Sequence, residues 1–207
     1  MKHDWKKDEK AFYAPKNGPE QVIMPAMNFF SIYGEGNPND EFFAEYIGVL
    51  YSLSYAIKMS PKQDLAPENY VDYCVYPLEG VWDLKEEAKF KPMDKLDKDA
   101  LVFNLMIRQP DFVTPEFATK IIELTKKKKP HPLLEKVIFT TIEEGACIQM
   151  LHLGSYDSEP QSFSAMEDFA KSKGLTRKSK IHREIYLSDA RRTAPEKLRT
   201  ILRFQLG

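Results

Sequence analysis

The segment HREIYLSD, at residues 182–189, places a glutamate near the middle of a run that otherwise looks like a β-strand. Because side chains alternate between the two faces of a strand, His182, Glu184, Tyr186 and Ser188 would share one face. An acid is buried in a strand only when a polar or charged group forms a hydrogen bond or an ion pair with it. This row of imidazole, carboxylate and phenol is either a hydrated sheet face or the wall of a pocket that accepts positive charge.

The opposite face of the same run carries Arg183, Ile185 and Leu187. Apolar side chains on one face of a strand usually pack in the core, so we expect a helix to cover this face. Arg183 would then lie away from any pocket that contains Glu184. From periodicity alone, a hydrated face is the more ordinary interpretation of the Glu184 row.

The first half of the chain follows the order strand, helix, strand, strand. The run QVIMPAMNFFSIY is apolar, although Pro25 weakens its first part as a strand. Asn39 is the expected N-cap of a helix that starts at EFFAEY and stops at Pro61. Two further strands are expected at residues 69–82, rich in tyrosine and valine, and at residues 100–109.

A connector at residues 111–142 leads to the second half. Thr114 should cap a helix with Pro115 at its first position, whereas PLLEKVIFTTIEE is compatible with helix or strand. The first order of elements then recurs from GACIQMLHLGS, with a helix between Ser158 and Gly174. The final run KLRTILRFQ alternates apolar and polar side chains, as a half-buried strand does.

This recurrence predicts an α+β fold of tandem βαββ repeats, with an antiparallel sheet and its helices on one side. Residues 1–19 are polar and have no periodicity, so we expect a flexible leader. Residues 20–207 would form a single domain whose halves lie at about 20–110 and 143–207.

Aligning VYPL of the first half with IYLS of the second places Tyr76 opposite Tyr186 and puts Cys74 in the place of Glu184. If both strands turn this face to a shared groove, the groove contains two phenols, a thiol and a carboxylate. Aromatic rings offer flat apolar area, and a carboxylate answers a positive charge. Such a site suits a flat, lipophilic or cationic small molecule. Neighbouring segments could add the aromatic walls Trp82, Phe30 and Phe103.

Each candidate also has a structural explanation. The tyrosines could pack across strands, and Trp82 could close the core at a strand end. His152, in QMLHLG, is either a proton shuttle or, more commonly, a hydrogen-bonded structural histidine. Cys74 is either a reactive thiol beside a cation or a small buried apolar residue.

The composition narrows the classes of function. Apolar residues make up 43% of the chain, which is typical of a folded globular protein. Lys plus Arg is 30 and Asp plus Glu is 31, so the basic excess of a nucleic-acid-binding protein is missing. The run KKKK at residues 126–129 is best explained as a solvated helix end before Pro130. The sequence has no CxxC, HExxH, GxSxG or glycine-rich phosphate loop, so we expect no metal and no cofactor.

The sequence also bears on location. No apolar run approaches the roughly 20 residues of a membrane helix, so no membrane partner is expected. The opening MKHDWKKDEK lacks the apolar region of a signal peptide. Cys74 and Cys147 are then expected to be reduced thiols in a cytoplasmic protein, with the oligomeric state left open.

Several stretches together resemble the GyrI-like small-molecule-binding family. They are PLEGVW, MIRQP, QMLHLG and EIYLSD, and weaker matches span nearly the whole chain after the leader. More narrowly, the chain is similar to the stand-alone bacterial branch of that family, which includes cyclopropanoid hydrolases. The resemblance implies a tandem βαββ fold with a ligand cleft between its halves, and binding of bulky aromatic or cationic compounds.

The resemblance also assigns residues. The family's central acid matches Glu184, within a Glu-x-Tyr pattern completed by Tyr186. Close relatives often have histidine at Arg183, tryptophan at Asp83 and proline at Ala190. The change at Asp83 could shrink the aromatic cage and bears on hydrolysis more than on the binding fold.

Three functions follow as hypotheses. The first is a module that binds flat lipophilic or cationic xenobiotics. The second is a hydrolase of cyclopropane-bearing, DNA-alkylating natural products that protects the cell. In this hydrolase Glu184 orients or deprotonates water, and tyrosine hydroxyls such as that of Tyr186 polarise the developing phenolate. The third is a structural or partner-binding protein whose cleft is incidental.

Overall fold

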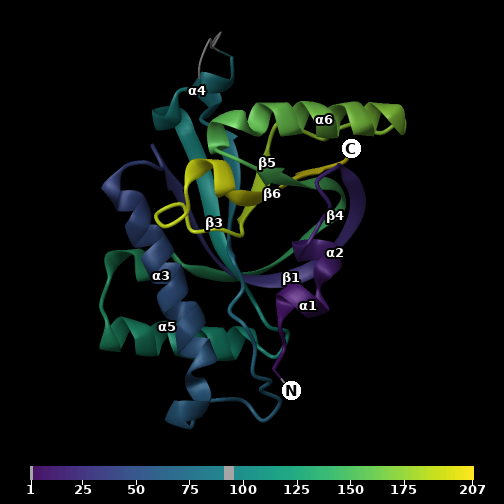
Figure 1. The fold of residues 1–207 in the computed structure, drawn as a ribbon. Helices are drawn as coiled ribbons and strands as arrows, with labels where there is room; N and C mark the ends of the chain where they lie inside the picture. The colour runs from purple at the N-terminus through teal and green to yellow at the C-terminus, as the bar shows by residue number, and fades with distance from the viewer. Residues whose placement is uncertain (1, 91–95) are drawn as a thin grey trace. The chain divides into compact units, whose positions relative to one another are not determined.

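The computed structural model describes residues 2–90 and 96–207, which form two compact units. Unit 1 contains residues 2–3, Met27–Leu78 and the described part of Trp82–Ile142. Unit 2 contains Asp4–Ala26, Glu79–Val81 and Glu143–Gly207. Figure 1 labels the elements of both units.

Unit 1 is built on two long antiparallel strands and two helices. Strand β1 (Glu20–Glu35) pairs with β3 (Leu101–Gln109), so that Phe30 lies opposite Ile107 and Gly34 opposite Phe103. Helix α3 (Glu41–Lys58) packs against β3, and α5 (Pro115–Lys128) packs against α3. Strand β2 (Leu78–Leu84) follows β3 in the strand order.

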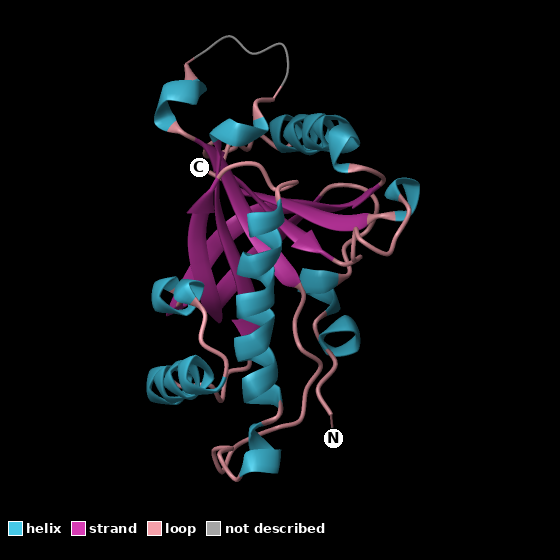
Figure 2. Cartoon of the chain, turned by 90° about the vertical axis from the view of Figure 1, so that its left-hand side faces the viewer, coloured by secondary structure: helices cyan, strands magenta, loops and turns pink. Residues whose placement is uncertain are grey.

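Helix α3 is the long helix that runs down the middle of Figure 2. Its buried residues Val49, Leu50, Leu53 and Ile57 lie on one stripe, which explains why this segment is a helix. Asp40 is its N-cap, with extended φ and ψ of −80° and 156° and no capping side-chain bond. The prediction that Asn39 is the cap is therefore wrong by one residue.

The strands of the first half differ from the predictions in two places. Strand β1 begins at Glu20 and runs through Pro25, which the sequence predicted to weaken it. Strand β2 begins only at Leu78, so most of the strand predicted at residues 69–82 is irregular. Pro77 precedes β2 and has no N–H to donate to a sheet, which explains where the regular ladder starts.

The connector agrees with its sequence signals. The Thr114 hydroxyl accepts a hydrogen bond from the Phe117 N–H at 3.2 Å, and Pro115 is the first residue of α5, as predicted. Helix α5 ends in lysines that face solvent, which confirms the solvated helix end. The ambiguous run PLLEKVIFTTIEE forms the turn η3 (Pro132–Lys136) and then the first part of strand β4 (Ile138–Leu153).

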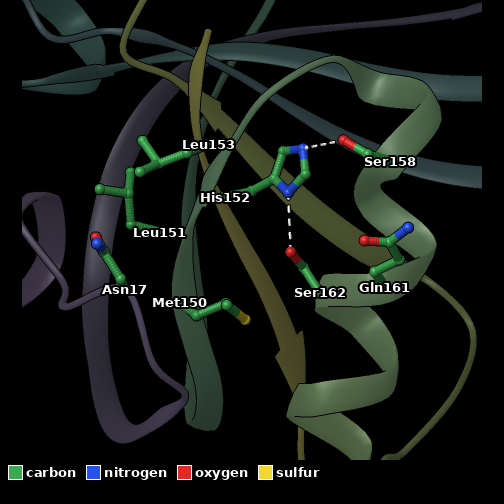
Figure 3. A pocket seen from close by; sticks show the side chains of 8 residues that line it. All are labelled: Asn17, Met150, Leu151, His152, Leu153, Ser158, Gln161 and Ser162. Atoms are coloured by element: carbon green, nitrogen blue, oxygen red, sulfur yellow. Dashed lines mark hydrogen bonds between the residues drawn. The ribbon is translucent and has the colours of Figure 1, made fainter. Parts of the chain in front are cut away.

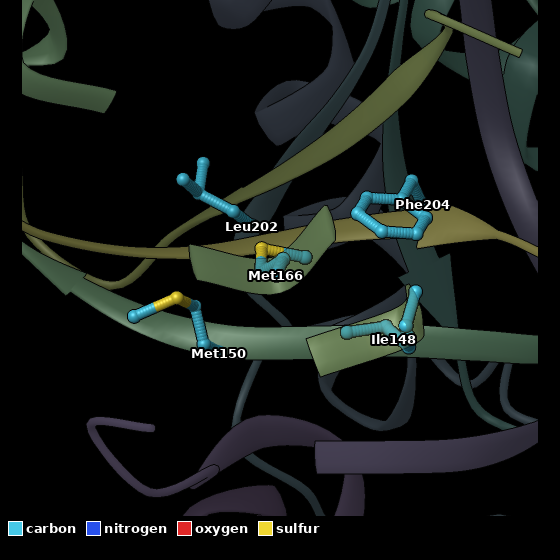
Figure 4. Packing of buried hydrophobic residues seen from close by; sticks show 6 residues of the cluster. Ile148, Met150, Met166, Leu202 and Phe204 are labelled. Atoms are coloured by element: carbon cyan, nitrogen blue, oxygen red, sulfur yellow. The ribbon is translucent and has the colours of Figure 1, made fainter. Parts of the chain in front are cut away.

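Unit 2 contains an antiparallel sheet covered by one helix. The strand order is β5 (His182–Tyr186), β6 (Arg199–Gln205) and β4. Helix α6 (Glu159–Ser172) lies over one face of this sheet, where it forms a hydrophobic cluster with β4 and β6. Figure 4 shows this cluster, which consists of Ile148, Met150, Met166, Ala170, Leu202 and Phe204.

The last strand is more buried than its pattern predicted. Arg199 is exposed, but both faces of β6 are buried from Thr200 to Phe204, and Ile201 and Arg203 are almost completely inaccessible. The half-buried prediction is therefore wrong. A buried arginine is paired with acids in the interior, and the alternation of the sequence cannot distinguish it from a hydrated one.

The first residues of the chain form structure that their sequence did not signal. Helices α1 (Trp5–Asp8) and α2 (Lys10–Tyr13) are single turns, too short for a periodic apolar pattern. The Trp5 and Tyr13 rings are buried, with centroids 5.2 Å apart. These turns belong to unit 2.

Five further short segments are helical: η1 (Ser60–Gln63), α4 (Glu86–Lys89), η2 (Lys98–Ala100), η4 (Tyr156–Ser158) and η5 (Pro195–Lys197). The predicted α+β class with antiparallel strands is confirmed, and the main elements follow the order β1, α3, β2, β3 and then β4, α6, β5, β6. The tandem repeat and the cleft between its halves stay predictions.

Candidate functional site

Glu184 lies in the middle of β5 and is 8% exposed. Its register partner on β6 is Leu202, which belongs to the cluster under α6. Because directly opposed side chains share a face, Glu184 faces the α6 side of the sheet. Contrary to the prediction from the sequence, helix α6 therefore does not cover the face of Arg183 and Ile185, because it packs on the face that contains Leu202 and Glu184.

The carboxylate of Glu184 contacts an imidazole of its own strand. His182 Nε2 lies 3.1 Å from Glu184 Oε1. The His182 ring meets the Phe163 ring of α6 edge to face, with centroids 4.7 Å apart. Helix α6 therefore fixes the orientation of His182, and His182 in turn positions one oxygen of Glu184.

A second acid, Glu159, adjoins Glu184. Glu159 is the first residue of α6, is 7% exposed and is hydrogen bonded through its side chain to Glu184. Burial, followed by the charge of Glu184, raises the pKa of Glu159 to about 10. Glu159 therefore holds a proton at neutral pH and donates it in the bond to Glu184.

Two tyrosines border these acids. The Tyr156 and Tyr186 rings meet edge to face, with centroids 6.1 Å apart. Burial, with the charges of Glu184 and Glu159, raises the pKa of Tyr156 to about 12, so that its hydroxyl remains a hydrogen-bond donor at neutral pH. We call the group of Glu184, Glu159, His182, Tyr156 and Tyr186 the acid cluster.

The other face of the same sheet also contains buried acids. Arg183 donates to Glu79 at 2.7 Å and its Nε lies 2.9 Å from Glu144. Glu144 accepts a further bond from Arg203 at 3.0 Å. Burial alone would raise the pKa of Glu144, but the charges of Arg183 and Arg203 hold it below its ordinary value. We call Arg183, Arg203, Glu79 and Glu144 the arginine network.

The start of the chain completes the arginine network. The Tyr13 hydroxyl donates to Glu79 at 3.3 Å, and Arg203 donates to the Phe12 carbonyl at 3.1 Å. Gln149 accepts from Arg203 at 2.9 Å and donates to the Ala11 carbonyl at 2.8 Å. As predicted, Arg183 lies on the face opposite Glu184, and its role there is to balance two buried carboxylates.

The predicted ligand walls Trp82 and Phe103 meet in unit 1. Their ring centroids are 5.5 Å apart, and Phe43 of α3 stacks on Trp82 at 5.9 Å. Phe103 also contacts Phe42 and Tyr46. Trp82 and Phe103 are both buried, so packing accounts for their positions, and their role as ligand walls stays a prediction.

Phe30 and Tyr76 have other surroundings. Phe30 is completely buried in unit 1 and contacts Phe139 at 5.6 Å. Tyr76 lies outside any strand; the Arg108 guanidinium lies 4.7 Å from its ring centroid, and its hydroxyl lies 3.3 Å from His3 Nε2. Tyr76 therefore does not take the strand position that would make it equivalent to Tyr186 of the second half, because β2 starts after Pro77.

Cys74 and Asp83 complete the residues considered from sequence. Cys74 is partly exposed and lies outside β2, so it does not take the strand position that matches Glu184. Asp83 in β2 forms an ion pair of 2.7 Å with Lys89. Cys147 is buried, and burial raises its thiol pKa to about 12, which makes it unreactive.

His152 lines a pocket of about 240 Å³ in unit 2 (Figure 3). Its Nδ1 lies 2.8 Å from Ser162 Oγ, and its Nε2 lies 3.0 Å from the Ser155 carbonyl and 3.2 Å from Ser158 Oγ. These bonds are those of a structural histidine. Ser158 is the N-cap of α6, as predicted, but its hydroxyl donates to the Ser155 carbonyl at 2.7 Å and makes no capping bond to α6.

The pocket is lined by residues from three segments: Asn17, then Met150, Leu151, His152 and Leu153 of β4, then Ser158, Gln161 and Ser162 at the start of α6. Within residues 2–90 and 96–207, no cluster of three or more histidine, cysteine or acidic side chains could hold a metal ion. The helices in these residues include none that is both long and apolar enough to cross a membrane.

Glu159 and Tyr156 are the site residues that the sequence did not reveal. An acid in the first turn of a helix is ordinarily explained by the helix dipole, so Glu159 gave no signal of its own. Tyr156 lies in a loop-like stretch without periodicity. Both residues are distant from Glu184 in the sequence. They lie near it because α6 packs against β5.

Comparison with known proteins supports one family. A model of the GyrI-like small-molecule-binding domain matches residues 19–206. A crystal structure of a hydrolase from Listeria innocua is 39% identical, covers 100% of each chain and has a TM-score of 0.90. A further one, also of a Listeria innocua hydrolase, is 38% identical over 99% of this chain and 100% of its own, with a TM-score of 0.88.

A more distant likeness concerns the fold alone. The C-terminal domain of EcmrR is 12% identical over 91% of this chain and 96% of its own, with a TM-score of 0.56. A comparison with curated proteins found no match. The family model covers nearly the whole chain, and the two hydrolases match it from end to end. The chain therefore belongs to the GyrI-like small-molecule-binding family.

Proposed function

We propose that the protein binds flat, lipophilic, positively charged small molecules at the acid cluster, with Glu184 as the acceptor of the positive charge. The observation that carries the proposal is a buried carboxylate whose basic partner is a histidine rather than an arginine or a lysine. In the described part of the chain, the ion pair of Glu184 is with His182 alone, and Glu159 has none. A buried charge without a counter-charge destabilises a protein, so a bound cation would stabilise this one.

The rings around Glu184 favour a flat ligand. Tyr156, Tyr186 and Phe163 present aromatic surface beside the carboxylate. Aromatic faces attract cations as well as flat apolar groups, so the same ligand could satisfy both the rings and the acid. This combination distinguishes a site for lipophilic cations from one for hydrophilic amines.

The test is a titration of N-methylacridinium, a flat cation of fixed charge, followed by fluorescence polarisation. Replacing Glu184→Gln should weaken binding by about 1–3 kcal/mol, which is the range of a charge-assisted contact. The matched control is Asp168→Asn, an exposed acid of α6, which should leave the affinity unchanged. Equal binding by wild type and Glu184→Gln would remove Glu184 from the site.

A second function, hydrolysis of cyclopropane-bearing DNA-alkylating compounds, is favoured by the two Listeria innocua relatives that are described as hydrolases. In this reaction Glu184 removes a proton from water, and the water oxygen attacks a ring carbon. The cyclopropane C–C bond breaks, and its electron pair passes to the conjugated ring, giving a phenolate that Tyr186 polarises and that takes up the proton.

Hydrolysis can be separated from binding by product analysis. Incubation with a spirocyclopropyl cyclohexadienone should give a product whose mass is that of the substrate plus one water, and Glu184→Gln should abolish the enzyme-dependent rate. A substrate that is bound but recovered unchanged would leave binding as the function and exclude the hydrolase.

A further inference from the structure

Glu159 has an oxygen that the fold leaves without a hydrogen bond. Its carboxyl group shares a hydrogen bond with the carboxyl group of Glu184, and among the described residues no N–H or hydroxyl group donates to its buried Oε1. The side chain is 7% exposed, so water does not readily replace the missing partner. Buried polar atoms are nearly always hydrogen bonded, so the Glu159 carboxyl group retains the capacity to interact with a further group.

The surroundings of Glu159 favour its protonated form. Glu184 and His182 face it from β5, and Tyr156 and Asp157 precede it in η4. The N-terminus of α6 favours a charged carboxylate, but by only about 0.3–1 kcal/mol. Burial and the adjacent Glu184 outweigh this, which is why the pKa of Glu159 rises to about 10.

We propose that a cation bound at the acid cluster takes the place of the Glu159 proton, so that each cation that binds releases one proton. This inference rests on the proposed function, because it describes how the same site accepts positive charge. The empty site holds one proton between two carboxyl groups and carries one negative charge. The occupied site holds two carboxylates around the ligand, and Glu159 gains a positive charge as its neighbour in place of its proton.

The physical reason is that the proton and the cation have the same electrostatic role. Each supplies one positive charge between two buried carboxyl groups that cannot both ionise alone. When the cation supplies that charge, the cost of ionising Glu159 falls and its proton leaves to solvent. By linkage, affinity for a fixed-charge cation should rise by up to about tenfold per pH unit while Glu159 is protonated in the free protein. A neutral ligand should show no such dependence.

The decisive experiment is calorimetric titration of N-methylacridinium in two buffers whose ionisation enthalpies differ, since the difference in heat counts the protons released. Wild type should release about one proton per cation. Glu159→Gln should bind the dye and release none, because glutamine keeps a donor for Glu184 but has no proton to lose. Asp168→Asn is the matched control and should release as many protons as wild type.

Infrared difference spectroscopy of the wild type provides a readout that needs no variant. Adding the dye should remove the C=O stretch of a protonated carboxyl group. Binding without proton release, with that band unchanged, would overturn the inference and leave the proposed function standing. Release of a full proton by Glu159→Gln would overturn the assignment to Glu159. No binding of the dye at all would overturn the proposed function and this inference with it.

Discussion

The two faces of the β5–β6–β4 sheet in unit 2 treat buried acids in opposite ways. On one face, Glu79 and Glu144 are balanced by Arg183 and Arg203, with bonds of 2.7–3.0 Å. On the other face, under α6, Glu184 is adjacent to another acid, Glu159, and to a histidine. Consecutive residues of β5, Arg183 and Glu184, supply the two faces.

This contrast distinguishes the arginine network, whose charges the fold balances, from the acid cluster, which we propose as the ligand site. Where each buried acid has an arginine, the charges are satisfied by the fold and the pKa of Glu144 is lowered. In the acid cluster, no arginine or lysine of residues 2–90 and 96–207 forms an ion pair with Glu184 or Glu159, and the pKa of Glu159 is raised. The opposite signs of these shifts follow from the different neighbours of the acids: arginines beside Glu144, and the carboxylate of Glu184 beside Glu159.

The largest change in stability should come from removing an arginine of the arginine network. Arg183→Met would leave Glu79 and Glu144 buried without their shared cation, so the free energy of unfolding should fall by about 3–5 kcal/mol. Urea unfolding measures this change. Arg199→Met, on the exposed start of β6, is the matched control and should change stability little. A loss of less than about 1 kcal/mol in Arg183→Met would mean that the two faces do not differ in the way described.

A smaller change in stability, of opposite sign, should come from replacing Glu159 in the acid cluster. The folded pKa of Glu159, about 10, lies above its ordinary value of 4.5, so the folded protein holds a proton that the unfolded chain loses. Stability from this group is therefore fully present below about pH 4 and is lost as the pH rises toward about 10. Glu159→Gln removes this loss and should stabilise the protein at neutral pH by on the order of 2 kcal/mol.

Urea unfolding of wild type and Glu159→Gln at acidic, neutral and alkaline pH tests this sign. The two curves should converge at acidic pH and separate as the pH rises, with the variant more stable. A variant that is less stable than wild type throughout would show that the Glu159 carboxyl makes a net stabilising contact. The face under α6 would then be structurally complete, as the arginine network is.

The smallest change, in ligand affinity, should come from replacing His182. Arginine is charged at all ordinary pH values and histidine is not, so His182 cannot balance Glu184 as Arg183 balances Glu79. His182→Gln, which keeps a neutral hydrogen-bond donor, should change the free energy of N-methylacridinium binding by less than about 1 kcal/mol. A variant that binds the dye much more tightly than wild type at mildly acidic pH, where an imidazole can be protonated, would instead identify His182 as the counter-charge of Glu184.

Much of the fold could be predicted from local signals. The helix that begins at Pro115 follows from its threonine cap, and α3 follows from its apolar stripe. The errors occur where tertiary context decides. The strand predicted at residues 69–82 contains the right residue types, but Pro77 interrupts the ladder. The one-turn helices α1 and α2 are stabilised by burial of Trp5 and Tyr13, which a local pattern does not show.

Part of the acid cluster could be predicted from the sequence. Strand alternation and the family resemblance indicate Glu184 and Tyr186, and each contacts another member of the acid cluster. Their role in binding or catalysis stays a prediction. Tyr76 could not be placed, because aligning two short strands assumes that both are strands. The face of the sheet that α6 covers could not be predicted either. Both faces of the strand are buried, so its alternation does not indicate which one contacts the helix.

The sequence by itself determined that Arg183 and Glu184 lie on opposite faces of β5, because the period of a strand is two residues. It also determined that the Glu184 face carries an imidazole and a phenol. Only the tertiary structure decided that α6 covers this face and brings Glu159 to Glu184, while Glu79 and Glu144 meet the arginines on the other. Charge balance inside a protein depends on groups that are distant in sequence, and local patterns carry no information about such pairs.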